Sequence, residues 1–300
     1  MSLSNRLLVA GIPLVPKPIV GFFSQRYIAG DKLEDAVRVV RELNRDGMMA
    51  TLDVLGEEVK SREEARAAAD TYKKVLAVIQ SEKLDANVSV KLTQMGLKLD
   101  PKFCREIFRE VVREARERGI FVRMDMEDSG CTEETLAMYD ELRREFSLVG
   151  VALQAYLRRT VCDADSLLRD GKANFRLCKG IYVEPRLIAY KNRELINRNF
   201  TLALERMLQG GAYVGIATHD ERLVWEGMRL VRELGLPQDR YEFQMLLGVD
   251  AELRRIILAA GHRLRIYVPF GDKWYPYSMR RLRENPQIAK YVLQNIFHRA

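Results

Sequence analysis

Charged and polar side chains interrupt several apolar runs of this 300-residue sequence, close to the point where each run ends. They supply amines, guanidiniums, carboxylates, amides, hydroxyls and an imidazole: Lys91, Asp125, Gln154, Arg176, Lys179, Thr218, His219, Asp220, Glu242, Gln244 and Tyr267. A buried charge without a partner costs several kcal/mol, so such a set must pair internally or bind a ligand. An isolated ion pair would explain any one position but explains the whole set poorly. The sequence therefore predicts one polar site assembled from many segments.

Two adjacent arginines near the C-terminus offer a second kind of chemistry. Within residues 274–285, helical spacing places Tyr277 one turn before Arg280 and Arg281, and Glu284 one turn after Arg281. Neighbouring guanidiniums can hold one carboxylate through charge-assisted hydrogen bonds. A solvent-exposed helix face would also produce an Arg-Arg pair, and this alternative stays open.

The elements that must position these residues alternate along the chain. Short runs rich in Val, Ile and aromatic residues are each followed by a longer amphipathic stretch. The expected strands are 47–55, 87–95, 120–126, 149–157, 174–182, 213–219, 241–247 and 263–268. The expected helices are 31–46, 61–81, 101–118, 132–146, 160–170, 185–209, 221–235, 250–260, 275–284 and 286–297.

Eight strand-then-helix units predict an α/β fold, a distorted (β/α)8 barrel of the TIM type with one extra N-terminal helix and C-terminal helices. Helix starts are indicated by Ser61 with Glu64, by Pro101 after an aspartate, and by Thr132 before two glutamates. An open doubly wound sheet is the competing architecture, which the count of eight units disfavours. In a barrel, the polar residues at the strand ends would face one active site.

We expect two regions, an N-terminal arm at 1–30 and a single barrel domain at 31–300, because no linker divides the chain. The apolar run 7–23 is interrupted by prolines and has no small-residue cleavage site, so it is interpreted as an arm and not as a signal peptide. No uninterrupted apolar segment reaches the length of a membrane-spanning helix.

Composition narrows the classes of partner. The net charge is +7, but charges of both signs alternate along the helical stretches, which disfavours nucleic-acid binding. The four cysteines form no C-x-x-C pair and the three histidines show no metal-ligand spacing, so neither a disulfide framework nor a metal site is expected. A cytoplasmic protein fits this pattern best.

The strand-end residues together with Arg-Ile-Tyr-Val-Pro-Phe-Gly at 265–271 and Tyr-x-x-Arg-Arg-Leu-x-Glu-Asn at 277–285 resemble the proline dehydrogenase family, including the catalytic domain of bacterial proline utilisation proteins. The resemblance covers nearly the whole chain after about residue 30, and the length favours the monofunctional bacterial form. It implies oxidation of L-proline to 1-pyrroline-5-carboxylate, the first step of proline catabolism. It further implies hydride transfer from proline C5 to N5 of non-covalently bound FAD, with electrons passed to a quinone.

The resemblance also implies roles for individual residues and for partners. The residues implied to bind FAD are Gln154, Arg176, Lys179, Gly180, Thr218, His219 and Glu284. Those implied to bind proline are Lys91, Leu246, Tyr267, Tyr277, Arg280 and Arg281, with Lys91, Asp125, Tyr267, Arg280 and Arg281 as the catalytic set and Asp125 orienting Lys91 and the substrate amine. Glu57 is implied as an acidic gate, with Asp53 or Glu58 as alternatives. The implied partners are a quinone, a peripheral contact with the inner face of a membrane, and a downstream pyrroline-5-carboxylate dehydrogenase.

Two other functions compete. A Schiff-base aldolase barrel would use Lys91 or Lys179 as a neutral amine at a strand end. A basic scaffold for a membrane or RNA would leave the strand-end residues without a role. The sequence has no G-x-G-x-x-G between a strand and a helix, so a Rossmann-type nucleotide site is not expected.

Overall fold

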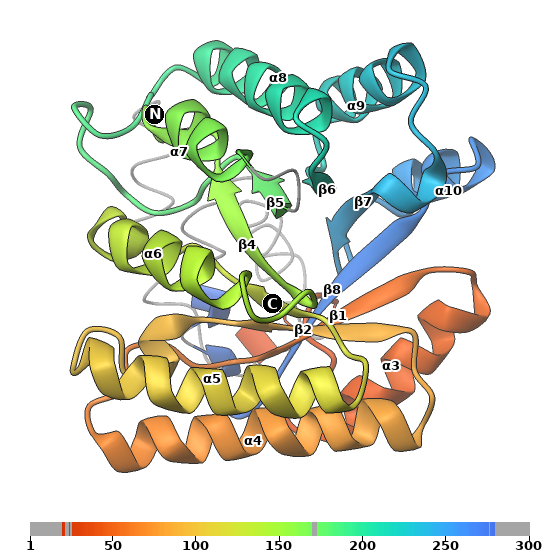
Figure 1. Cartoon of the computed structure of the whole chain (residues 1–300). Helices are drawn as coiled ribbons and strands as arrows, with labels where there is room; N and C mark the ends of the chain where they lie inside the picture. The colour runs from red at the N-terminus through yellow and green to blue at the C-terminus, as the bar shows by residue number, and fades with distance from the viewer. Residues whose placement is uncertain (1–19, 22–23, 25, 170–172, 276, 280–300) are drawn as a thin grey trace, which may run out of the picture.

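A closed barrel of eight parallel strands forms the centre of the computed structural model, which describes residues 20–21, 24, 26–169, 173–275 and 277–279 (Figure 1). The strands pair in chain order and the last pairs with the first. They are β1 (Met49–Val54), β2 (Ala86–Val90), β3 (Val122–Met124), β4 (Val149–Gln154), β5 (Asn174–Cys178), β6 (Tyr213–Ala217), β7 (Tyr241–Leu246) and β8 (Leu264–Phe270). The predicted barrel is confirmed, and the open sheet is excluded.

Helices surround the strands and shield them from water (Figure 1). They are α3 (Leu33–Arg45), α4 (Arg62–Ser81), α5 (Pro101–Glu117), α6 (Thr132–Leu142), α7 (Thr160–Leu167), α8 (Arg193–Gln209), α9 (Glu221–Glu233) and α10 (Ala251–Ala259), with short 3-10 helices at Leu92–Met95, Ser129–Cys131 and Gln238–Arg240. Their apolar faces pack against the outward-facing Val, Ile and Leu side chains of the strands, as expected for strands buried on both sides.

The predicted start signals act through side-chain caps at two helices. The Ser61 side chain accepts a hydrogen bond from the backbone N–H of Glu64 at the start of α4. Asp100 caps α5 in the same way, and Pro101 occupies the first turn. The predicted start at Thr132 is confirmed, although no side-chain cap is present there: a 3-10 turn precedes α6 and the N-cap position belongs to Cys131.

The helix expected at 185–209 begins only at Arg193, and this is the largest correction to the predicted elements. Asn192 caps it by accepting a hydrogen bond from the N–H of Leu195. Upstream, Ala189 forms an antiparallel bridge with Leu157, which holds the chain in a loop that follows β5. Propensity alone favoured helix there, but the contact with a distant segment overrides it.

The two ends of the chain are described only in part. Of the predicted arm, the backbone N–H of Ala29 donates to Pro269 O at 2.9 Å, so the arm's last residues pack on β8. Of the expected helix 275–284, Tyr275 and residues 277–279 are helical, whereas the expected helix 286–297 lies outside the described residues. Within the described part of the chain, no helix is long and apolar enough to cross a membrane.

Candidate active site

The interior of the barrel is lined by charged and polar side chains instead of the branched apolar residues that usually fill such barrels. Those with less than a tenth of their surface exposed include Asp53, Ser89, Lys91, Arg123, Arg176, Glu242, Gln244 and Arg265. They project from six of the strands or from the residue directly after a strand. All of them except Arg123 are linked through Asp125 and one another by hydrogen bonds and ion pairs.

Lys91, directly after β2, is held by an ion pair. Its Nζ donates to Asp53 Oδ1 at 2.7 Å and lies 3.8 Å from Asp125 Oδ2 and 3.4 Å from the Tyr267 hydroxyl. Burial lowers the pKa of the Lys91 ammonium, but the two carboxylates outweigh this effect and raise the pKa well above its usual value. Lys91 is therefore a cation at neutral pH, which argues against the neutral amine that a Schiff-base aldolase needs.

Asp125, directly after β3, is the junction between Lys91 and the rest of the cluster. Its carboxylate accepts hydrogen bonds from Ser89 Oγ and the Tyr267 hydroxyl, each at 2.7 Å, and pairs with the Arg176 guanidinium. Burial raises the pKa of Asp125, but Arg176 and Lys91 lower it by more than burial raises it. The pKa of Asp125 therefore lies below its usual value. The sequence had suggested that Asp125 orients Lys91. The carboxylate closest to Lys91 is instead that of Asp53.

Arg176 on β5 is fixed from several sides. Its Nη1 donates to Ser89 Oγ at 2.9 Å, and its guanidinium carbon lies 5.2 Å from the centre of the Tyr267 ring. The structure thus brings four predicted residues, Lys91, Asp125, Arg176 and Tyr267, into one hydrogen-bonded group. The two fixed cations of this group can stabilise negative charge that develops beside them.

Gln154 and Gly180 flank this group at the ends of β4 and β5. Gln154 is 2% exposed; its Nε2 donates to Met126 O at 3.2 Å, while its Oε1 is buried with no hydrogen-bond partner. Gly180 has a φ of +100°, and a Cβ placed there would lie 2.1 Å from the Tyr156 ring. An unused buried acceptor is a feature that a bound ligand would explain. The glycine at 180 is required by its positive φ and by the Tyr156 ring beside it.

Lys179, Thr218 and His219 lie at the ends of β5 and β6. Lys179 Nζ pairs with Asp220 Oδ2 at 2.6 Å, and the Thr218 hydroxyl accepts from the Asp220 N–H at 3.1 Å. His219 Nε2 accepts from the backbone N–H of Leu246 at 2.8 Å, so this nitrogen carries no proton. The predicted cofactor residues that are described therefore share one rim of the barrel.

The residues predicted to contact the substrate ring come from the end of the barrel and the segment after it. Leu246 and Tyr267 are neighbours in the register of β7 and β8. Tyr277 is buried in a small cluster with Leu55 and Ile28. The remaining predicted residues, Arg280, Arg281 and Glu284, lie outside the described residues.

Glu57 follows β1 and is half-buried, where the sequence placed an acidic gate. Of its two alternatives, Asp53 holds Lys91, and Glu58 pairs with Lys98 at 2.5 Å. Glu57 remains the predicted gate.

Two buried acids were missed by sequence reasoning as members of the site. Asp53 was considered only as a gate, although its two-residue spacing from Thr51 marks it as inward-facing. Glu127 was not considered; it is 4% exposed, and its carboxylate accepts from Thr93 N at 3.0 Å and from the Thr93 hydroxyl. Burial raises the pKa of Glu127 to about 7.

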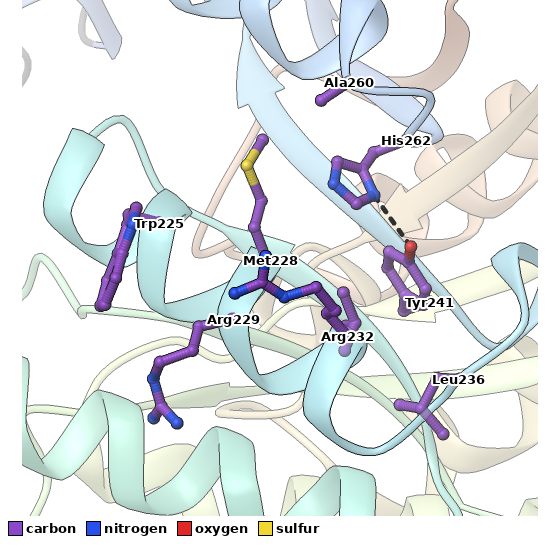
Figure 2. Close-up of a pocket in the computed structure, with 9 residues that line it drawn as sticks. Trp225, Met228, Arg229, Arg232, Leu236, Tyr241, Ala260 and His262 are labelled. Atoms are coloured by element: carbon purple, nitrogen blue, oxygen red, sulfur yellow. Dashed lines mark hydrogen bonds between the residues drawn. The ribbon is translucent and has the colours of Figure 1, made fainter.

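A separate cavity of about 430 Å³ lies between α9 and the turn before β8 (Figure 2). It is lined from α9 by Trp225, Met228 and Arg232. At its wall, the Tyr241 hydroxyl and His262 Nδ1 share a hydrogen bond of 2.8 Å. Tyr241 begins β7, so this cavity lies at the opposite end of the strands from the candidate active site.

Comparison with known proteins gives consistent matches. The family model described as proline dehydrogenase matches residues 36–294. Proline dehydrogenase 1 of Bacillus subtilis (strain 168) is 37% identical over 273 residues, which cover 91% of this chain and 90% of that protein. Proline dehydrogenase of Deinococcus radiodurans is 35% identical over 278 residues, which cover 91% and 89%.

A solved structure agrees in fold. Proline utilization A from Bdellovibrio bacteriovorus, inactivated by N-propargylglycine, superposes with a TM-score of 0.80 and 27% sequence identity. The match covers 86% of this chain and 32% of that chain, so this chain corresponds to about a third of the longer protein.

Proposed function

Because this chain belongs to the proline dehydrogenase family, whose reaction is the first step of proline catabolism, we propose that it oxidises L-proline to 1-pyrroline-5-carboxylate with non-covalently bound FAD and passes the electrons to a quinone. The observation that carries the proposal is the buried group of Lys91, Asp125, Arg176 and Tyr267 at the C-terminal end of the barrel. In barrels of this type, that end is where active sites lie.

The residues on the rim fit FAD. The unpartnered Gln154 Oε1 suits an N–H donor such as a flavin ring offers, and Gly180, which a side chain could occupy only by displacing Tyr156, is proposed for the same site. Arg176 and Lys179 supply positive charge for an anionic cofactor. Thr218 and His219 complete this set on β6, and Glu284 is proposed for it from the sequence alone. When bound, FAD supplies the acceptor for the hydride that leaves proline C5.

The protein's own residues bind and orient the substrate. The Lys91 ammonium, kept charged by Asp53, is proposed to bind the proline carboxylate. Arg280 and Arg281 are proposed to bind the same carboxylate from the other side. Leu246 and Tyr267, together with Tyr277, are proposed to pack against the pyrrolidine ring. Fixing the ring by its carboxylate and its apolar face removes rotational freedom before reaction, which is a recognised source of rate enhancement.

Asp125 holds the substrate-binding and cofactor-binding residues in one arrangement. Its carboxylate accepts a hydrogen bond from the Tyr267 hydroxyl and forms an ion pair with Arg176. A shift in the position of Tyr267 or Arg176 would therefore be transmitted to the other residue through this carboxylate. Glu57 is proposed to act as the gate over this site. We further propose that residues 1–30 form an arm and residues 31–300 one catalytic unit.

A quinone acceptor has consequences for the surroundings of the protein. Quinones with long apolar tails reside in membranes, so a peripheral contact with the inner face of a membrane is part of this proposal. The product, a cyclic imine acid, is the proposed substrate of a downstream pyrroline-5-carboxylate dehydrogenase.

The visible spectrum of the purified full-length protein, recorded before and after anaerobic addition of L-proline, tests the proposal. We expect a flavin band at about 450 nm that bleaches with L-proline and not with D-proline. A flavin band that L-proline leaves unchanged would rule out the substrate. Absence of any band, even after incubation with FAD, would rule out the cofactor.

A variant pair tests the assignment of Lys91. Lys91→Met should keep the flavin band and raise the KM for proline, because it removes a substrate contact and not a cofactor contact. Lys74→Met, at an exposed position of α4, is the matched control and should behave like the wild type. Loss of the band in Lys91→Met alone would assign Lys91 to the cofactor instead.

A further inference from the structure

A chain of hydrogen bonds continues from Arg176 toward the N-terminal ends of β7 and β8. Arg176 Nε donates to Gln244 Oε1 at 2.6 Å, and Gln244 Nε2 donates to Glu242 Oε1 at 2.6 Å. Glu242 is held in turn by Arg265, whose Nε lies 2.7 Å from the same oxygen. Charges thus alternate along the barrel axis below the site, with one neutral amide placed between a cation and a carboxylate.

The ionisation of Glu242 fixes which way the Gln244 amide faces. Burial raises the pKa of Glu242, but Arg265 and the hydrogen bonds from Tyr213 and Gln244 lower it to about 2. A carboxylate can only accept hydrogen bonds, so Gln244 must turn its NH2 group toward Glu242. Its oxygen therefore points to Arg176 Nε, which can only donate.

Gly215 on β6 provides the space in which this amide lies. A Cβ placed at Gly215 would come 2.3 Å from Gln244 Nε2 and 2.8 Å from its amide carbon. The φ of Gly215 is not in the left-handed region, so the backbone does not require glycine at this position. The close approach of the Gln244 side chain does.

We propose that Gln244, oriented by Glu242 and accommodated by Gly215, is a positioning residue that fixes the Arg176 guanidinium in the active site. Asp125 and Ser89 hold Nη1 from one side, and Gln244 holds Nε from the other. Two anchors on different nitrogens define the plane of the guanidinium, whereas one anchor leaves it free to rotate. The inference rests on the proposed function, in which Arg176 stabilises negative charge on the reduced cofactor.

Gln244→Met in the full-length FAD-bound protein is the direct test, because methionine has a similar volume but offers Arg176 no strong acceptor. We expect FAD to stay bound, its midpoint potential to fall, and the rate constant for reduction by bound proline to drop about tenfold to a hundredfold. The dissociation constant for proline should change by less than about threefold, since Lys91 is untouched.

Gly215→Ala is the second test, which does not alter Gln244 chemically. The added methyl group should displace the amide and lower the potential in the same direction as Gln244→Met. Gly227→Ala on α9 is the matched control, because the nearest atoms its added Cβ would meet belong to side chains packed outside the barrel, the Phe243 ring at 3.0 Å and Ile216 Cδ1 at 3.2 Å. It should leave the potential unchanged.

The outcomes separate the inference from the function on which it rests. A Gln244→Met protein with bound FAD and wild-type potential and reduction rate would overturn the inference and leave the function intact. An equal fall of potential in Gly227→Ala would also overturn it, because any crowding around the barrel would then suffice. A wild-type protein whose flavin is not reduced by proline would instead reject the proposed function.

Discussion

Replacement of Glu127 by glutamine should change how the stability of this protein depends on pH. Glu127 follows β3 with 4% of its surface exposed, and its carboxyl group bonds to the backbone and hydroxyl of Thr93. Burial raises its pKa from 4.5 to about 7. The folded protein therefore keeps a proton that the unfolded chain releases as the pH rises above 4.5.

The sign and the size follow from proton linkage. The stability that Glu127 provides is fully present below pH 4.5 and is lost as the pH rises through about 7. At 1.36 kcal/mol for each pKa unit, the loss is about 3 kcal/mol. Glutamine has a similar shape and does not titrate, so the variant should lack this loss.

Urea unfolding of wild type and Glu127→Gln at pH 5 and pH 8 measures the effect. The free energy of unfolding of the variant minus that of wild type should increase by about 2.5 kcal/mol from pH 5 to pH 8, because a small part of the loss in wild type has already occurred at pH 5. Glu133→Gln, at a side chain that is 79% exposed on α6, is the control and should give a difference that does not vary with pH. Parallel pH profiles for wild type and Glu127→Gln would refute the reasoning, because they would mean that Glu127 ionises as it does in the unfolded chain.

Three further substitutions test other parts of the structure. Asp53→Asn removes the nearest carboxylate from the buried Lys91 ammonium, so urea unfolding should show a loss of about 3–5 kcal/mol and steady-state kinetics a raised KM for proline; an unchanged KM would remove Lys91 from the substrate site. Gly180→Ala should weaken FAD binding about tenfold or more in a titration of apoprotein, because the methyl group would strike a tyrosine ring; Gly211→Ala, also at positive φ but facing open space, should not. Ser61→Ala should lower the free energy of unfolding by about 1 kcal/mol through loss of a helix cap, without affecting proline oxidation.

The strands were predictable because each is a short run rich in Val, Ile or aromatic residues between longer amphipathic segments. All eight predicted runs overlap an observed strand, although the second run turns into a 3-10 helix after Lys91. The loop before Arg193 was not predictable, since it depends on a bridge between Leu157 and Ala189 that no local signal announces. Sequence patterns report preferences over a few residues, and such a bridge is decided by packing between distant segments.

The site shows the same division. The strand-end position of Lys91 was visible in the sequence, but its pairing with Asp53 depends on the stagger between β1 and β2, which no sequence pattern specifies. The role of Gln244 depends likewise on which side chains face it across the barrel. The roles of Arg280 and Arg281, which lie beyond the described residues, remain predictions.

The pairing of β1 with β8 has a consequence for synthesis on the ribosome. Met49 to Val54 pair with Arg265 to Phe270, and Arg265 reaches Met49 across 216 positions of the sequence. While the intervening residues are being translated, β1 has no partner on that side and presents an open strand edge, the kind of surface on which chains associate wrongly. The barrel therefore cannot close until β8 has left the exit tunnel, and until then the open edge of β1 is exposed to association with other chains.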